Sequence, residues 1–96
     1  MKINFTKNGD IMDVVLQGRL DTTTAHDFDS FIAGNLDGVT MLNLNCEKLV
    51  YLSSAGLRVL LVAHKKMGGK MKLTGVNDLV MEVFELTGFA DIFVIE

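Results

Sequence analysis

The chain has 96 residues, 49% of them hydrophobic, and a formal net charge of -3 at pH 7. A chain of this length forms one small domain over residues 1–96, and its hydrophobic fraction suffices for a real core, which excludes a disordered protein. The net negative charge argues against nucleic acid as a direct partner, and a lone cysteine, Cys46, excludes a disulfide framework or a Cys-based metal cluster.

The first part of the chain predicts a β-hairpin followed by a helix. Residues 2–7 and 11–17 read as strands, and the tripeptide NGD between them is a strong hairpin signal. The helix is expected within residues 22–36, where Asp21 or Thr22 can cap it by accepting a hydrogen bond from a free backbone N–H. Its apolar positions recur at helical spacing: Ala25, Phe28, Ile32 and Leu36.

The middle of the chain predicts a buried strand, a connection and a second helix. The strand covers residues 39–45, and Cys46 directly after it is expected to be a small buried hydrophobe. In the connection, residues 46–52, three side chains are expected to turn to the core: Leu49, Tyr51 and Leu52. The helix begins at Ser54 and stops at Gly68-Gly69. Its predicted inward stripe is Leu57, Leu60, Leu61 and His64.

The C-terminal part predicts a strand over residues 70–74, a helix that starts at Asn77 or Asp78 and ends at Gly88, and a strand over residues 91–95. The apolar positions of this helix are Leu79, Val80, Val83, Phe84 and Leu86. The complete order is ββαβαβαβ. It predicts an α/β fold with a mixed sheet, right-handed crossovers and helices packed mainly on one face.

Charge is distributed unevenly along the chain. No acid occurs from Ser54 to Asn77, whereas this segment contains five basic residues: Arg58, Lys65, Lys66, Lys70 and Lys72. The favoured interpretation is a solvated helix and turn, not a dedicated basic site. The N-terminal sequence, MKINFTKNGD, is too polar for a signal peptide, and no apolar run is long enough to span a bilayer. These observations predict a cytoplasmic protein that does not engage a membrane.

The segment LVYLSSAGLRVLL, residues 49–61, places two adjacent serines between an apolar run and a helix. One interpretation is purely structural, because Ser53 or Ser54 can cap the helix, which is worth roughly 1 kcal/mol. Gly56 would then allow close packing of the helix on the sheet. A catalytic nucleophile is poorly supported, because a nucleophile elbow requires G-x-S-x-G and Leu52 occupies the first glycine position.

Other catalytic and cofactor signals are missing as well. His64 lies more than two turns along the same helix, out of reach of Ser54, and no signal singles out His26. No segment has the phosphate-binding spacing G-x-x-x-x-G-K-[ST]. We therefore expect a protein that is not an enzyme and that holds neither a cofactor nor a metal.

The third interpretation of the serines is a phosphorylation switch at Ser54. A hydroxyl in the first turn of a helix is exposed, and the helix dipole and free N–H groups favour an anion there. Arg58, one turn further on, could pair with the phosphate. Phosphorylation adds roughly -1.5 to -2 charges. Against a partner fitted to a neutral hydroxyl, a penalty of about 3 kcal/mol lowers affinity on the order of 100-fold without unfolding the protein.

Several segments together resemble the STAS domain family, in particular the bacterial anti-sigma factor antagonists. LVYLSSAGLRVLL resembles the family's serine signature, and GRLDTTTA, residues 18–25, resembles its G-x-L-D-x-x-x-A segment. LNLNCEKL fits the strand and loop before the serine. VMEVFELTGFADIFVI, residues 80–95, resembles the final helix, turn and strand. The similarity covers nearly the whole chain with its spacings kept.

The resemblance implies a cytoplasmic switch that is substrate and ligand, not catalyst. By position, the family's phosphorylated serine falls on Ser54, and Asp21 matches an aspartate near it at the partner-binding surface. The other residues expected to line the surface seen by the kinase are Thr22, Ser53, Gly56 and Arg58. Unphosphorylated, such a protein binds an anti-sigma factor, often a serine kinase, and frees a sigma factor. The kinase releases it by phosphorylation, and a serine phosphatase resets it.

Two departures from the family pattern leave alternatives open. Ser53 stands where antagonists usually have Asp, so Ser53, Ser54 or neither could be modified. The chain ends directly after the last predicted strand, so the C-terminal helix of many members is expected to be absent. Phe84, Phe89 and Phe93 nearby suggest a homodimer surface, although burial in the core is favoured. The main rival function is a STAS scaffold that is never phosphorylated, or a soluble subunit of a membrane transport system.

Overall fold

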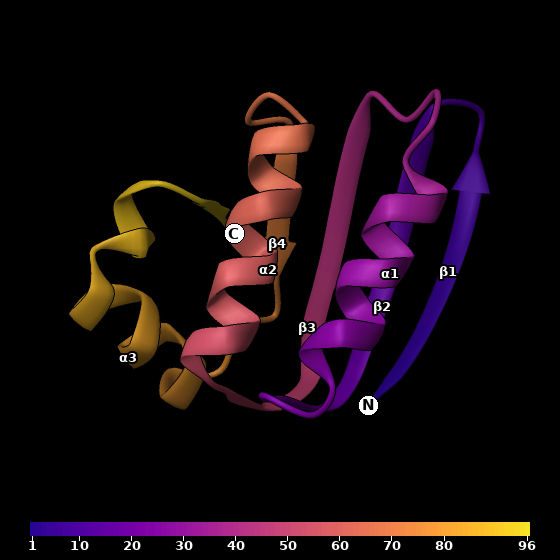
Figure 1. Cartoon of the computed structure of the whole chain (residues 1–96). Coiled ribbons are helices and arrows are strands. Elements are labelled where there is room, and N and C mark those ends of the chain that lie inside the picture. Colours follow the sequence, from indigo (N-terminus) through magenta and orange to yellow (C-terminus); the bar gives the residue numbers. More distant parts are fainter.

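The computed structural model describes residues 1–96, and its elements follow the predicted order (Figure 1). The strands are β1 (Lys2–Asn8), β2 (Ile11–Leu20), β3 (Met41–Leu52), β4 (Met71–Thr74) and β5 (Val94–Ile95). The helices are α1 (Ala25–Asn35), α2 (Ser54–Lys66), α3 (Asp78–Thr87) and the short 3-10 helix η1 (Phe89–Asp91). None of them has the length and apolar composition needed to cross a membrane.

The strands form one five-stranded sheet in the order β1-β2-β3-β4-β5. β1 runs antiparallel to β2, and each later pair of neighbours is parallel. Because the parallel strands follow one another in chain order, each right-handed crossover places its helix on the same face of the sheet. In Figure 1, α1 and α2 lie side by side on the near face, with α3 beyond α2. The predicted mixed sheet with helices mainly on one face is confirmed.

The predicted connection over residues 46–52 is wrong, because these residues form the second half of β3. β2 is longer than expected as well and continues to Leu20, so the two strands pair along almost their whole length. Their register shifts at two places, between Val15 and Gln17 and between Gly18 and Arg19. Such irregularities disrupt the alternation of buried and exposed residues. Without that alternation, the second half of β3 could not be predicted as a strand from the sequence.

The end of β3 presents one side chain differently from the prediction. Leu49 and Leu52 are buried as expected, but Tyr51 is 36% exposed. Its ring lies outside the core, where the guanidinium of Arg19 stands 4.1 Å from the ring centroid. This cation–π contact holds Arg19, on the neighbouring strand, across the surface of Tyr51.

The hydrophobic core fills the layer between the sheet and the helices. It contains 22 buried residues in one cluster, including Phe28 of α1, Leu60 of α2 and Phe84 of α3. Cys46 belongs to this cluster, and its burial raises the pKa of the thiol to about 12. The thiol therefore stays protonated at neutral pH, and the predicted role of Cys46 as a small buried hydrophobe is confirmed.

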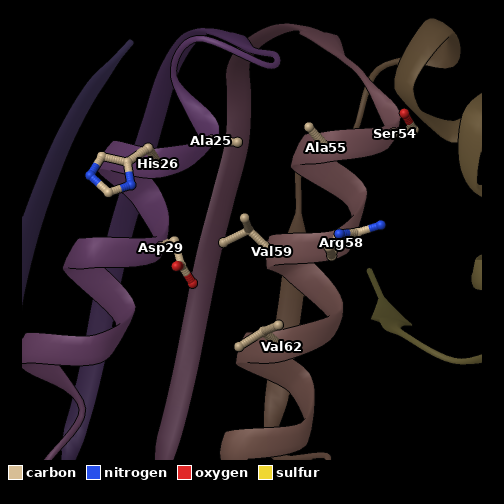
Figure 2. A pocket seen from close by; sticks show the side chains of 8 residues that line it. All are labelled: Ala25, His26, Asp29, Ser54, Ala55, Arg58, Val59 and Val62. Carbon is tan, nitrogen blue, oxygen red and sulfur yellow. The ribbon is translucent and has the colours of Figure 1, made fainter.

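α2 buries a somewhat different stripe from the predicted one. Leu57 and Leu60 are buried as expected, but Leu61 and His64 are only half-buried. Val59 is buried and points toward α1 in Figure 2. Because α1 lies beside α2, it covers the side chains on that flank of α2. The buried face of α2 is therefore rotated toward α1, relative to the predicted stripe.

α3 buries a narrower face than its sequence predicts. Val80 and Phe84 are buried and Val83 is half-buried, but Leu79 and Leu86 are 57% and 79% exposed. α3 is the last helix of the row and packs on β3 and η1, so no helix covers its outer side. Leu79 and Leu86 therefore lie outside the core, although they belong to the apolar positions of this helix.

Aromatic rings gather where α3, η1 and β5 meet. The Phe93 ring lies edge-to-face against Phe84 and Phe89, with ring centroids 5.5 Å apart in both pairs. It also meets the His64 ring of α2 at 5.5 Å. Phe84 and Phe93 are buried and Phe89 is half-buried, so these rings belong to the chain's own core and do not form a free surface for a homodimer.

α3 begins and ends as the sequence predicts. Asn77 is its N-cap, and Gly88 ends it in the left-handed conformation with a φ of 82°. Residues 89–91 then form η1, so the strand predicted over residues 91–95 is reduced to Val94–Ile95. The local capping signals are therefore confirmed, whereas the length of β5 is not.

Asn77→Ala is expected to lower the free energy of unfolding by about 2 kcal/mol. The Asn77 side-chain oxygen accepts a hydrogen bond from the backbone N–H of Val80 at 2.8 Å, and its amide donates to the carbonyl of Leu49 at 2.8 Å. Urea denaturation measures the change. Asn77→Ser keeps a capping oxygen and loses the bond to Leu49, so it should cost about half as much. Equal losses in both variants would contradict this division.

Candidate functional site

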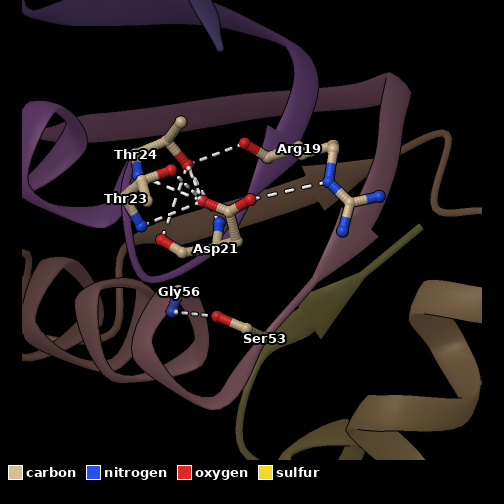
Figure 3. A network of polar contacts seen from close by, with 6 residues as sticks. All are labelled: Arg19, Asp21, Thr23, Thr24, Ser53 and Gly56. Carbon is tan, nitrogen blue, oxygen red and sulfur yellow. Dashed lines mark hydrogen bonds and ion pairs between the residues drawn. The ribbon is translucent and has the colours of Figure 1, made fainter.

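The two serines have different roles at the start of α2. Ser53 is the N-cap: its backbone is extended, and its Oγ accepts a hydrogen bond from the N–H of Gly56 at 3.4 Å (Figure 3). Its own N–H donates to the carbonyl of Leu20 at 2.9 Å. Ser54 is the first helical residue, its side chain is exposed, and its hydroxyl forms no hydrogen bond within the chain. The Ser53 hydroxyl therefore has a structural role as the helix cap, whereas the Ser54 hydroxyl has no hydrogen-bond partner in the chain.

Gly56 allows α2 to approach the end of β2 closely. A Cβ atom at this position would lie 2.6 Å from Cγ of Leu20, 2.8 Å from the carbonyl oxygen of Leu20 and 2.9 Å from Cδ1 of Leu52. No real Cβ atom makes such contacts, so only glycine fits here. Gly56 is itself buried, so the prediction that it lines the surface is wrong. It allows the close packing of α2 on the sheet, and its N–H donates to the Ser53 cap.

The loop between β2 and α1 is organised by Asp21 (Figure 3). Its Oδ1 accepts hydrogen bonds from the hydroxyl of Thr23 at 2.7 Å and from the backbone N–H groups of Thr23 and Thr24 at 3.0 and 3.1 Å. Its Oδ2 lies 3.5 Å from Nε of Arg19. The N-cap position of α1 is Thr24, and no side chain caps this helix, so the prediction that Asp21 or Thr22 caps it is wrong. Asp21 accepts its backbone N–H groups in the loop before α1, and Thr22 is exposed.

These hydrogen bonds stabilise the charged form of Asp21. The bond from the Thr23 hydroxyl is the largest cause, desolvation opposes it, and the backbone N–H groups of Thr24 and Thr23 add to it, which lowers the pKa of Asp21 from 3.8 to about 2. A carboxylate whose pKa is lowered by folding stabilises the folded state above its unfolded pKa, and this contribution disappears as the pH falls through the folded value.

Asp21→Asn is accordingly expected to have a lower melting temperature than the parent protein at pH 5–7. The difference should shrink as the pH falls below 3.8 and should vanish only below about pH 2, where the parent carboxyl is mostly protonated. Thermal denaturation across this pH range measures it. Asp37→Asn, which removes an exposed carboxylate without hydrogen bonds, is the control and should show no such convergence. A constant difference between pH 2 and 7 for Asp21→Asn would contradict the assignment.

A groove between α1 and α2 begins at Ser54, and we call it the α1–α2 groove. It has a volume of about 460 Å³. It is lined by Ala25, His26 and Asp29 of α1 and by Ser54, Ala55, Arg58, Val59 and Val62 of α2 (Figure 2). His26 and Ser54 lie on opposite sides of it, and the ring points away from the hydroxyl, so the two do not form a nucleophile–base pair. No group of acidic, Cys or His side chains could hold a metal ion.

The structure brings the predicted residues together from two segments of the chain. The backbone bond from Ser53 to Leu20 joins the start of α2 to the loop that carries Asp21 and Thr22. Arg58 is exposed one turn beyond Ser54 and lines the same groove. Sequence reasoning did not place the α1 residues of the groove in the site. The spacing of these residues places them on one face of α1. It does not predict which other helix lies against that face.

Comparison with known proteins decides the family. The STAS domain model matches residues 2–96. The chain belongs to the STAS domain family. The STAS domain is 34% identical over 97 residues to BtrV of Bordetella bronchiseptica, a candidate anti-sigma factor antagonist, and the match covers 97% of this chain and 84% of BtrV.

Solved structures share the fold at lower sequence identity. A candidate anti-sigma factor antagonist from Thermotoga maritima has a TM-score of 0.88 at 19% identity, with 97% of this chain and 84% of that chain covered. SpoIIAA, an anti-sigma factor antagonist and Bacillus cell fate determinant, has been solved in two forms. The unphosphorylated form gives a TM-score of 0.77 at 17% identity, covering 99% and 87% of the chains, and the phosphorylated form 0.75 at 18%, covering 99% and 91%.

Proposed function

We propose that this STAS domain is an anti-sigma factor antagonist that docks when Ser54 is unmodified and is released when Ser54 is phosphorylated. The observation that carries the proposal is the free, exposed hydroxyl of Ser54 at the positive end of α2. A regulatory surface needs a group that can change without disturbing the fold, and Ser54 meets that condition.

Of the two serines, Ser54 is the one we propose as the modified residue. The Oγ of Ser53 accepts from Gly56, and Ser53 is only partly exposed, so phosphorylation there would act on a group that holds the helix start. A phosphate on Ser54 would extend into solvent. The nearby N–H groups of the first turn and the Arg58 guanidinium, which forms no ion pair in the chain, could receive it.

The proposed partner is an anti-sigma factor that is also the serine kinase, with a serine phosphatase that restores the unmodified form, all in the cytoplasm. The BtrV relationship supports the antagonist role. That SpoIIAA has been solved both with and without phosphate, in the fold that this chain shares, supports a switch that leaves the domain folded. The surface around Ser54 would act as a docking face without catalysing a reaction, and Asp21, Thr22, Ser53 and Arg58 would border it.

The test uses Ser54→Ala protein as bait in cell extract, because a variant that cannot be released should retain its partner. We expect a kinase that binds ATP and inhibits a sigma factor. With that kinase and ATP, the parent protein should gain the mass of one phosphate on Ser54, whereas Ser54→Ala should gain none. A stable complex in which neither serine gains mass would instead favour an unphosphorylated scaffold or a transport subunit, and equal modification of Ser54→Ala would point to Ser53.

A further inference from the structure

The α1–α2 groove has an apolar floor and opposite charges on its two sides. Ala25, Ala55, Val59 and Val62 form most of the floor, and all four are buried or half-buried. Asp29 stands on the α1 side and Arg58 on the α2 side, both exposed. The groove is therefore suited to an apolar ridge with charged flanks, and less suited to a small polar molecule.

The charges of Asp29 and Arg58 are not satisfied within the chain. The chain contains two ion pairs, Arg19 with Asp21 and Lys72 with Glu96, and neither involves the groove. Neither side chain forms a hydrogen bond either. Both charges therefore remain available to a partner.

The local surroundings reinforce the opposite signs of the two sides. α1 contains Asp27 and Asp29 and no lysine or arginine, and the whole segment from Leu20 to Glu47 is free of both. α2 contains three basic residues and no acid. Because each helix carries one sign of charge, the groove has a defined polarity across its width.

We propose that the α1–α2 groove receives a helix of the anti-sigma factor, with an apolar row on the floor, a basic side chain against Asp29 and an acidic side chain against Arg58. This inference rests on the proposed function. Two helices that lie side by side offer a groove along their axes into which a third helix packs with its apolar row. The polarity of the groove then admits only one orientation of that helix.

The groove also explains how a modification at Ser54 would act over a whole interface. Ser54 lies at one end of the groove and precedes Arg58 by one helical turn. A phosphate there would place negative charge on the α2 side and pair with Arg58, which removes the positive partner of the incoming acidic side chain. Both sides of the groove would then be negative, and the acidic flank of the bound helix would be repelled from the α2 side.

The test exchanges the two charges while the net charge stays the same. The variant Asp29→Lys/Arg58→Asp reverses the polarity of the groove. Its net charge equals that of the parent, so long-range attraction or repulsion due to net charge does not change. We expect the dissociation constant for the anti-sigma factor recovered with the Ser54→Ala bait to rise about 100-fold, measured by isothermal titration calorimetry. The matched control, Glu85→Lys/Lys70→Asp, makes the same exchange at exposed positions outside the groove and should bind within about twofold of the parent.

The outcomes separate this inference from the proposed function. If the anti-sigma factor binds the parent protein and the exchanged variant equally well, the groove is not the docking site, although the antagonist role stands. If the chain alone forms a dimer that the exchange dissolves, the groove belongs to a second copy and the inference is overturned. Failure to recover any anti-sigma factor overturns both. Thermal denaturation confirms that each variant is folded, and the milder Asp29→Asn and Arg58→Gln should each weaken binding by about tenfold.

Discussion

Gly56→Ala is expected to lower the free energy of unfolding by about 3 kcal/mol. The added methyl group would lie 2.8 Å from the carbonyl oxygen of Leu20, a backbone atom that cannot rotate away. It would also collide with the side chains of Leu20 and Leu52, both of which are buried in the core. The clash can be relieved only by moving the start of α2 away from β2.

The matched control for this substitution is Gly34→Ala. Gly34 is also a helical glycine, in α1, but nothing lies within 4 Å of its Cβ position, and its φ is not positive. Alanine should therefore stabilise α1 by about 0.5 to 1 kcal/mol through its better helix propensity. Urea denaturation of both variants should show that the free energy of unfolding falls in Gly56→Ala and rises in Gly34→Ala. A stabilised Gly56→Ala protein would show that α2 does not need this close approach.

Ser54→Asp is expected to weaken binding of the anti-sigma factor on the order of 100-fold, which corresponds to about 3 kcal/mol. The substitution places a permanent negative charge at the exposed first position of α2. The fold should tolerate it, because an acidic residue in the first turn interacts favourably with the helix dipole. The melting temperature should therefore stay close to that of the parent protein while affinity falls.

Two control variants distinguish charge from shape at this position. Ser54→Asn has the size of the aspartate without its charge and should retain most of the affinity, whereas Ser54→Ala should bind normally and resist release by the kinase. Calorimetric titration gives the affinities, and thermal denaturation gives the stabilities. Global unfolding of Ser54→Asp would contradict an exposed helix start, and unchanged binding would remove Ser54 from the interface.

Features that depend on neighbouring residues in the chain were predictable from the sequence. The NGD hairpin, the start of α3 at Asn77 or Asp78 and its end at Gly88 were predicted from short-range backbone chemistry, and all three are found in the structure. The alternation of strands and helices after the hairpin was sufficient to predict parallel strands and one covered face, because right-handed crossovers leave few alternatives. The helix start at Ser54 followed from the same kind of local signal.

Features that depend on contacts between distant segments were not predictable. The second half of β3 forms because β2 extends alongside it, and the register shifts between them remove the alternation that would have marked a strand. Leu79 and Leu86 have the spacing of core residues, but no helix lies beyond α3 to cover them. In each case the outcome depends on a segment that is distant in the sequence, so the local pattern could not predict it.

The candidate site divides along the same line. The sequence by itself determined that a serine opens a helix, that Arg58 follows one turn later and that Asp21 precedes α1, because helix caps and periodicity are local properties. Only the tertiary structure decided that Ser53 is the cap and Ser54 the free hydroxyl, that Gly56 packs closely against Leu20, and that Asp29 and Arg58 line the same groove from opposite helices. These features depend on how closely α1, α2 and β2 approach one another. The packing of the whole core sets these distances, so they cannot be predicted from any single segment of the sequence.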